Sequence, residues 1–191
     1  MSAAHDELEV KARVEDPDAL ARALLRAGAE RVFQGEMIDR RFDRKGRLEQ
    51  KDEVLRLRLY RPADGGAVWG ELGWKGPKST RGDYRHRVEW QTRVTDPEAV
   101  LSILPRLGFD VSIRIDRRIE QWRLGGAVVR IEWYPEMDVL VEVEGEPEDI
   151  ERAIGATGLP RTAFLAESLP HFVRAYERRT KRRARLAAEP A

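Results

Sequence analysis

The residues that could do chemistry begin with a short alternating stretch, Glu7-Leu8-Glu9-Val10-Lys11. Successive side chains of a β-strand point to opposite faces, so the three charged residues would share one face and the two apolar residues the other. Two carboxylates two residues apart can hold a divalent cation, and the neighbouring ammonium group can hold an anion. A half-buried strand with one wet face would show the same alternation, so this stretch alone leaves both interpretations open.

The same alternation recurs along most of the chain, with Leu, Val, Ile and Trp on the faces opposite the charges. Arg outnumbers Lys in these rows, and its guanidinium is suited to bidentate binding of phosphate oxygens. An ordinary wet face would carry more Thr, Ser and Gln, so we expect the rows to share an interior. The charged positions are Arg56, Arg58, Glu71, Lys75, Arg85, Arg87, Glu89, Arg114, Asp116, Arg118, Arg130, Glu132, Glu142 and Glu144.

Strands and helices that begin at a proline are expected to position these residues. Asp16-Pro17 and Asp96-Pro97 each predict a helix start, with Asp as the N-cap and Pro at the first helical position. Each start follows a charged strand, so residues 7–20 and 87–100 form a repeated unit, with a looser copy at 141–150. Residues 163–178 predict a last helix with a boundary or kink at Pro170. Strands are expected at residues 7–14, 37–43, 54–60, 68–75, 85–94, 111–122, 127–133 and 141–144.

Composition narrows the classes of function. The chain of 191 residues, 41% hydrophobic, is expected to form one domain with a real core. It has no apolar stretch near the ~20 residues of a membrane span and no secretory signal. The absence of cysteine and the presence of three histidines favour a cytoplasmic protein whose metal, if any, is a hard cation held by carboxylates. With 35 Lys and Arg against 34 Asp and Glu, a nucleic-acid partner is not expected.

A closed barrel would reconcile these patterns. If the strands close, the charged rows point to the interior and the helices cover the apolar outer faces. Such an interior is stable only when acids and bases offset one another, because an unpaired buried charge is strongly destabilising. A bound metal polyphosphate would complete that balance.

Residues 7–178 resemble the CYTH superfamily, or triphosphate tunnel metalloenzymes, which includes thiamine triphosphatases, inorganic triphosphatases and class IV adenylyl cyclases. The resemblance implies an α+β fold in which a closed, antiparallel, eight-stranded β-barrel forms a tunnel with a charged interior, flanked by helices. We expect this domain at residues 1–178 and a basic, frayed tail at 179–191. The segments that carry the resemblance, in order, are Glu7–Lys11, Asp39 with Phe42-Asp43, Leu55–Arg58, Trp74–Pro77, Arg87–Glu89, Arg114–Arg118, Ile131-Glu132 and Val141–Glu144.

The resemblance also implies roles for the charged residues. Metal ligands for Mg²⁺ or Mn²⁺ would be Glu7, Glu9, Glu142 and Glu144. Phosphate ligands would be Lys11, Arg56, Arg58, Lys75, Arg87, Arg114, Arg118 and Arg130, where alternation favours Arg114 and Arg118 over Arg117. Catalytic roles would fall to Lys11, Glu89 and Glu132, and the two acids would support the metal site or hold a second metal. The partner would be a small molecule that contains a triphosphate, without a membrane, and a homodimer is left open.

Three functions remain open at this point. Metal-dependent hydrolysis of a triphosphate is favoured, because it requires only a positioned water. A class IV adenylyl cyclase, which makes cyclic AMP and pyrophosphate from ATP, would use the same tunnel, and Trp74–Pro77 looks more like that branch. A non-catalytic module that captures polyphosphate or nucleotides would share the basic rows and need no metal.

Overall fold

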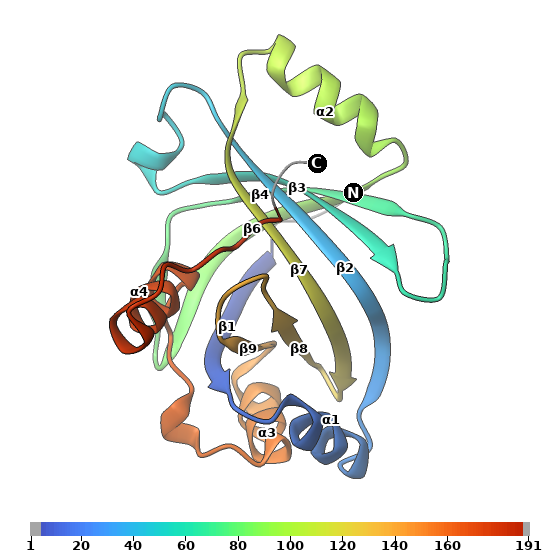
Figure 1. Ribbon diagram of the computed structural model, residues 1–191, viewed down its shortest axis with the longest axis vertical. Coiled ribbons are helices and arrows are strands. Elements are labelled where there is room, and N and C mark those ends of the chain that lie inside the picture. The colour runs from blue at the N-terminus through green and yellow to red at the C-terminus, as the bar shows by residue number, and fades with distance from the viewer. Residues whose placement is uncertain (1–4, 189–191) are drawn as a thin grey trace.

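Antiparallel strands close into a barrel (Figure 1) in the computed structural model, which describes residues 5–188. The strands are β1 (His5–Val14), β2 (Glu30–Asp43), β3 (Val54–Pro62), β4 (Trp69–Lys75), β5 (Ser79–Arg81), β6 (Tyr84–Val94), β7 (Asp110–Leu124), β8 (Ala127–Trp133) and β9 (Val139–Glu144). Their order is β1-β9-β8-β7-β2-β3-β4-β6, and pairing of β1 with β6 completes the circle of eight. The short β5 pairs only with β6. The predicted eight-stranded barrel is therefore confirmed, with one additional strand.

The barrel closes at β1, which changes neighbours half-way along its length. His5 to Glu9 pair with β6, and Glu9 to Val14 pair with β9. Paired residues on neighbouring antiparallel strands point to the same face of a sheet. Glu9, which is opposite Arg85 on one side and Glu144 on the other, therefore faces the interior together with both of them.

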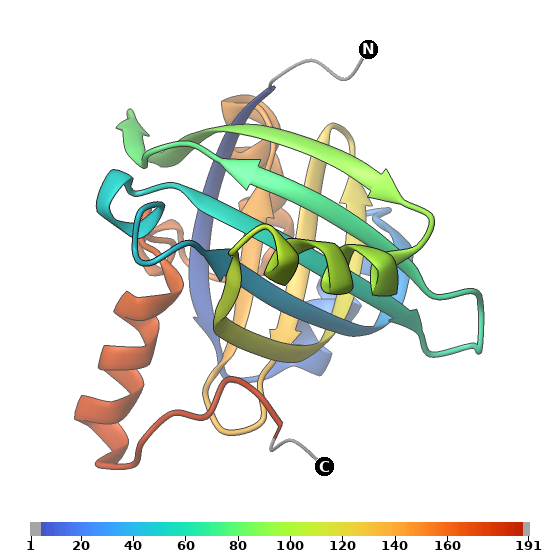
Figure 2. The same ribbon diagram turned by 90° about the horizontal axis from the view of Figure 1, so that it is seen from above.

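Helices cover the apolar outer faces of the strands, as Figures 1 and 2 show. Below the barrel in Figure 1, α1 (Pro17–Arg26) and α3 (Pro147–Thr157) pack with Leu24 and Ile150 against Val143 of β9. On another side, α2 (Pro97–Arg106) packs Leu104 against Leu57 of β3. The main hydrophobic core thus lies between strands and helices, while the charged faces look inward. No helix among residues 5–188 is long and apolar enough to span a membrane.

The expected strand-then-helix repeat is present. The Asp16 carboxylate accepts the Ala19 backbone N–H at 2.8 Å, and Asp96 accepts that of Ala99 at 2.9 Å. These N-caps begin α1 and α2 directly after β1 and β6, because each satisfies a backbone donor that the first turn leaves free. In the third copy, β9 is followed by α3, which begins at Pro147 without a side-chain cap.

The last helix, α4 (Leu169–Thr180), packs at one end of the barrel (Figure 2). The helix expected at residues 163–178 begins later, with Pro170 in its first turn. It follows the 3-10 turn η2 (Arg161–Ala163) and Leu165, whose backbone exchanges two hydrogen bonds with Lys11 of β1. Beyond α4, the Leu186 carbonyl accepts the backbone N–H of Asp116 at 2.7 Å. The expected boundary at residue 178 falls inside α4, and residues 189–191 lie outside the described chain.

Candidate functional site

The charged rows of most strands converge on the inside of the barrel. Because an unpaired charge is strongly destabilising away from water, each buried side chain needs a partner of opposite sign. The charged residues that face this interior and are more than nine-tenths buried are Glu7, Glu9, Lys11, Asp39, Arg56, Arg58, Lys75, Arg87, Glu89, Arg117, Arg130, Glu132 and Glu142.

Cations from β3 and β4 neutralise the acids of β1 and β6. The Lys75 ammonium pairs with Glu7 and lies 3.1 Å from a Glu89 carboxylate oxygen. The Arg56 guanidinium donates to the other Glu89 oxygen at 2.9 Å. Burial raises the pKa of Glu89, but Arg56 and Lys75 outweigh burial and lower it overall. Glu89 is therefore an anion held between two cations.

Lys11 occupies the corresponding position between β1 and β9. Its ammonium lies 2.9 Å from Glu9 and pairs with Glu142, whose second oxygen accepts from Arg130 at 2.5 Å. Burial lowers the pKa of Lys11, yet Glu142 and Glu9 raise it overall, so the group stays charged. Glu9 also pairs with Arg85, a residue outside the predicted site. The sequence signal for Arg85 was its position in the same alternating row as Arg87.

Glu144 is the exception in this balanced interior. Among the described residues, no Lys or Arg forms an ion pair with it. Burial, followed by the charge of Glu7, raises its pKa to about 7. The end of β9 therefore has a partly buried acid that Arg130 and Lys75 influence only from a distance, without an ion pair.

The acids of β1 and β9 suit a hard divalent cation by their chemistry, and added positive charge beside Glu144, whose pKa is raised, would be stabilising. The four predicted ligands, Glu7, Glu9, Glu142 and Glu144, all face the interior on neighbouring strands. No three acidic or histidine side chains of residues 5–188 converge in a metal-binding arrangement, however. Glu7, Glu9 and Glu142 each bind a Lys or Arg instead. The donor set fits the metal, and binding it requires those acids to exchange partners.

A second group of charges surrounds Asp39, which is fully buried on β2. Its Oδ2 lies 3.5 Å from Arg58 Nε and 3.3 Å from Arg117 Nη2. Burial raises the pKa of Asp39, but Arg58, Arg41 and Arg117 together lower it to about 2. This carboxylate is the counter-ion of an arginine cluster. It was not among the predicted site residues, although its segment contributed to the family resemblance.

Arg117 also contacts Glu132 and Tyr134 of the neighbouring strand and turn. Arg117 Nη1 lies 3.5 Å from Glu132 Oε1 and donates to the Tyr134 hydroxyl at 3.3 Å. That hydroxyl donates to the other Glu132 oxygen at 2.5 Å. Burial and Glu132 raise the pKa of Tyr134 well above its usual range, so Tyr134 remains a hydrogen-bond donor.

The predicted inward placement of Arg114 and Arg118 is wrong. Both side chains are exposed on the outer face of β7, where Arg118 stacks over Trp133 at 3.7 Å from the ring centroid. The pairing of β7 with β2 sets this orientation, because Met37, which faces inward, is opposite Arg117. The interior therefore receives Arg117 from β7, beside apolar residues such as Ile115.

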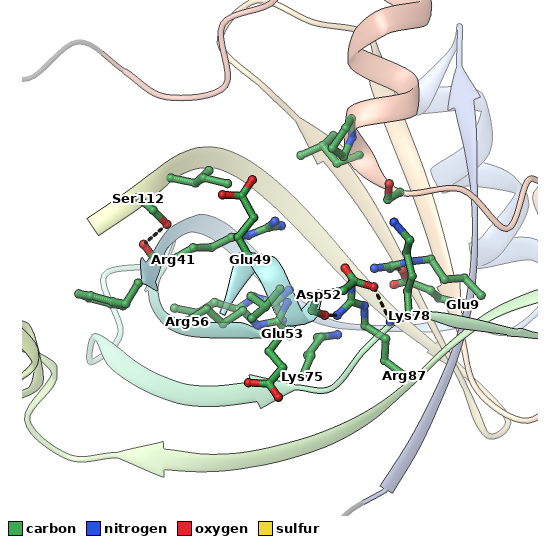
Figure 3. Close-up of a pocket in the computed structure, with 18 of the residues that line it drawn as sticks. Glu9, Arg41, Glu49, Asp52, Glu53, Arg56, Lys75, Lys78, Arg87 and Ser112 are labelled. Atoms are coloured by element: carbon green, nitrogen blue, oxygen red, sulfur yellow. Dashed lines mark hydrogen bonds and ion pairs between the residues drawn. The ribbon is translucent and has the colours of Figure 1, made fainter. Parts of the chain in front are cut away.

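Two cavities occupy the two ends of the tunnel. The first, about 430 Å³, opens beside α4 and contains Arg56, Lys75 and Arg87 from three strands (Figure 3). Arg87 is also bound there by Asp52, 2.9 Å away. Nine Lys or Arg and six Asp or Glu line this cavity, so it favours a polyanion. The second, about 210 Å³, lies at the opposite end, and the side chains of Arg56 and Arg58 line both cavities.

The sequence profile of the CYTH domain matches residues 5–162. The chain belongs to the CYTH domain family. CYTH proteins of the triphosphate tunnel type act on triphosphates as triphosphatases or adenylyl cyclases and generally depend on a divalent metal. The resemblance found in the sequence is thereby confirmed.

Solved structures share the CYTH fold of this chain at low sequence identity. A Vibrio parahaemolyticus protein described as a "putative adenylate cyclase" has a TM-score of 0.74 and 19% identity, covering 90% of this chain and 99% of that one. Protein PH1819 of Pyrococcus horikoshii OT3 has a TM-score of 0.68 and 21% identity over 92% and 99%. HpAC1 of Hippeastrum is described as a "putative adenylyl cyclase" with a dominant triphosphatase activity. It has a TM-score of 0.63 and 18% identity, covering 88% of this chain and 95% of that one. A comparison with curated proteins finds no match.

Proposed function

We propose that this CYTH protein is a divalent-metal-dependent phosphohydrolase that acts on a triphosphate bound in its tunnel. The observation that carries the proposal is the first cavity, where an excess of Lys and Arg faces the carboxylates of β1 and β9. A triphosphate needs both kinds of group, because cations bind its oxygens and acids can hold the metal that bridges them.

The interior side chains would divide the work. Glu7, Glu9, Glu142 and Glu144 would hold Mg²⁺ or Mn²⁺, which when bound offsets negative charge on the phosphate oxygens. Phosphate ligands would be Lys11, Arg56, Arg58, Lys75, Arg87, Arg117 and Arg130. These cations would orient the phosphates in line with an attacking water, while the closed wall of strands excludes other water.

Glu132 and Glu89 are the candidates for handling the proton of the attacking water. Glu132 Oε1 is buried and makes no hydrogen bond in the described chain, although Arg117 Nη1 lies 3.5 Å away, and Glu132 Oε2 accepts from Tyr134. A carboxylate oxygen that makes no hydrogen bond can accept a proton from a water within hydrogen-bond reach. Glu89 is already bound by two cations, so we assign the proton transfer to Glu132 and the positioning of Arg56 and Lys75 to Glu89.

The competing functions use the same tunnel. Adenylyl cyclase names among the structural relatives support cyclisation of ATP, yet HpAC1 carries such a name and is described as dominated by triphosphatase activity. That description supports hydrolysis. Phosphate release from inorganic triphosphate, thiamine triphosphate and ATP should be measured with Mg²⁺ or Mn²⁺. Cyclic AMP formed from ATP without hydrolysis of inorganic triphosphate would contradict the proposal.

A variant pair separates an enzyme from a non-catalytic binding module. Glu7→Gln with Glu9→Gln should abolish metal-dependent turnover, because both changes remove metal ligands, while calorimetry should find that the triphosphate still binds. Glu36→Gln, an exposed acid on the outer face of β2, is the control and should retain activity. If the double variant turns over at the wild-type rate, these two acids have no part in catalysis.

A further inference from the structure

The second cavity contains a cluster of aromatic side chains at the end of the tunnel opposite α4. Phe33, Tyr60 and Trp69 line it. Tyr60 and Trp69 stack with ring centroids 3.9 Å apart and an interplanar angle of 11°, and Phe33 meets Tyr60 edge-on at 5.5 Å. Among the described residues that line the larger first cavity, Phe42 and Tyr134 are the only aromatic ones, and they do not stack on each other. Aromatic surface is therefore concentrated at one end of the tunnel.

Charge distinguishes the two ends as well. Acids outnumber cations in the second cavity, with Glu7, Glu71, Glu89 and Glu144 against Arg56, Arg58 and Arg130. Without a metal at Glu7 and Glu144, further phosphate groups would be repelled there. A neutral or cationic group would not, and the exposed guanidinium of Arg93 already lies over the Trp69 ring, 4.8 Å from its centroid. One face of Trp69 can thus receive a planar group, and the exposed Arg93 side chain covers that face in the structure.

Arg56 and Arg58 connect the two ends, since their side chains line both cavities. A triphosphate bound at these two guanidiniums would direct its phosphate chain into the cationic cavity. Any group attached to the phosphate chain would then enter the aromatic cavity, whose volume of about 210 Å³ suits a ring rather than a large molecule.

We propose that the aromatic cavity is a subsite for the planar heterocycle of an organic triphosphate whose phosphates lie at Arg56 and Arg58. This inference rests on the proposed function of the tunnel and specifies its substrate class. The heterocycle replaces Arg93 over the Trp69 ring, with Phe33 at the cavity wall. Offset stacking between aromatic rings favours this contact.

Trp69→Ala tests the subsite, because inorganic triphosphate lacks the heterocycle and serves as an internal control. The kcat/KM for ATP or thiamine triphosphate should fall by about tenfold through KM, while kcat/KM for inorganic triphosphate should stay unchanged. Trp90→Ala, which removes a tryptophan that is 47% exposed on the outer face of the barrel, should change neither value. An equal loss on organic and inorganic substrates, or no loss on either organic one, overturns the subsite.

Binding measurements keep this inference separate from the proposed function. Calorimetry with ATP and inorganic triphosphate should find that Trp69→Ala weakens ATP alone, whether or not the wild-type protein hydrolyses either compound. Loss of hydrolysis in the wild type with this binding pattern retained would reject the proposed function and keep the subsite. If Trp69→Ala does not fold, Phe33→Leu removes another wall of the cavity, and the same selective loss for ATP is expected. Equal affinities in that variant and wild type would then reject the subsite.

Discussion

Asp39 is a single carboxylate that neutralises several guanidiniums of the tunnel. It contacts Arg58 and Arg117, and its Oδ1 has no hydrogen-bond partner within residues 5–188. In a substrate-bound tunnel, phosphate oxygens would supply further negative charge to the same arginines. Asp39 therefore has two connected effects, on the stability of the empty barrel and on the orientation of its phosphate ligands.

Asp39→Asn should lower the free energy of unfolding by about 3 kcal/mol, because it leaves buried guanidiniums with excess positive charge. Added inorganic triphosphate should then raise the melting temperature of the variant more than that of the wild type, since the ligand replaces the lost negative charge. Thermal unfolding with and without the compound measures both effects. A variant as stable as the wild type would show that Asp39 is not the required counter-ion.

Glu144 predicts a dependence of stability on pH in the metal-free protein. Burial and Glu7 raise its pKa from 4.5 to about 7, so the folded state holds a proton that the unfolded chain loses near pH 4.5. Between these values the folded state binds more protons, and the free energy of unfolding falls as pH rises. The resulting decrease in the free energy of unfolding is at most about 3 kcal/mol and is complete above pH ~7.

Urea unfolding at pH 5 and pH 8 measures this effect, with a chelator present. Glu144→Gln should remove most of the loss, because the amide cannot ionise, and should make the protein more stable than the wild type at pH 8. The exposed Glu36→Gln should leave the wild-type pH dependence in place. Equal pH dependence in wild type and Glu144→Gln would mean that another group is responsible.

At the scale of elements, β7 shows where alternation is informative and where it is not. Along β1, Leu8 and Val10 lie on one face of the strand, and Glu7 and Glu9 lie on the other. Only one orientation of the strand buries the apolar face under helices. That strand could be oriented from the sequence. Along β7 both faces carry apolar or charged residues, since Ile115 and Arg117 face inward while Arg114 and Arg118 face outward.

The orientation of β7 depends on its pairing with β2, which is distant in the sequence. Adjacent charges at Arg40 and Arg41 also hide which side of β2 faces the interior, and the same ambiguity concealed Asp39. Alternation therefore predicts the fold and the inward position of acids and bases wherever one face is wholly apolar. It fails where a strand carries charge on the outer face as well, because only the long-range register can then decide.

A pair of substitutions on β7 tests this orientation functionally. Arg117→Gln should lower kcat/KM for triphosphate by roughly 10- to 100-fold, because a charge-assisted hydrogen bond contributes about 1.5–3 kcal/mol. Arg114→Gln, on the same strand but on its exposed outer face, should retain wild-type kinetics. A larger loss for Arg114→Gln than for Arg117→Gln would contradict the inward assignment of Arg117.

At the scale of the whole molecule, the barrel has its apolar core outside and its charges inside. Within the tunnel Lys11 forms an ion pair with Glu142 and Lys75 forms one with Glu7, so the acids and bases neutralise one another. A triphosphate that binds these ammonium groups leaves the acids unpaired, and a metal that binds the acids leaves the ammonium groups unpaired. Each ligand alone therefore creates the charge that the other would offset.

Metal and triphosphate should consequently bind with positive coupling. We expect Mg²⁺ to tighten the binding of inorganic triphosphate by at least about tenfold, within the range typical of coupled sites. Because Mg²⁺ also binds free triphosphate, titrations should be compared at equal concentrations of the unbound anion and at matched ionic strength. In Glu7→Gln with Glu9→Gln the coupling should largely vanish, since fewer acids remain to be released. Equal affinity with and without metal in the wild-type protein would mean that the ion pairs of the empty tunnel do not open when substrate binds.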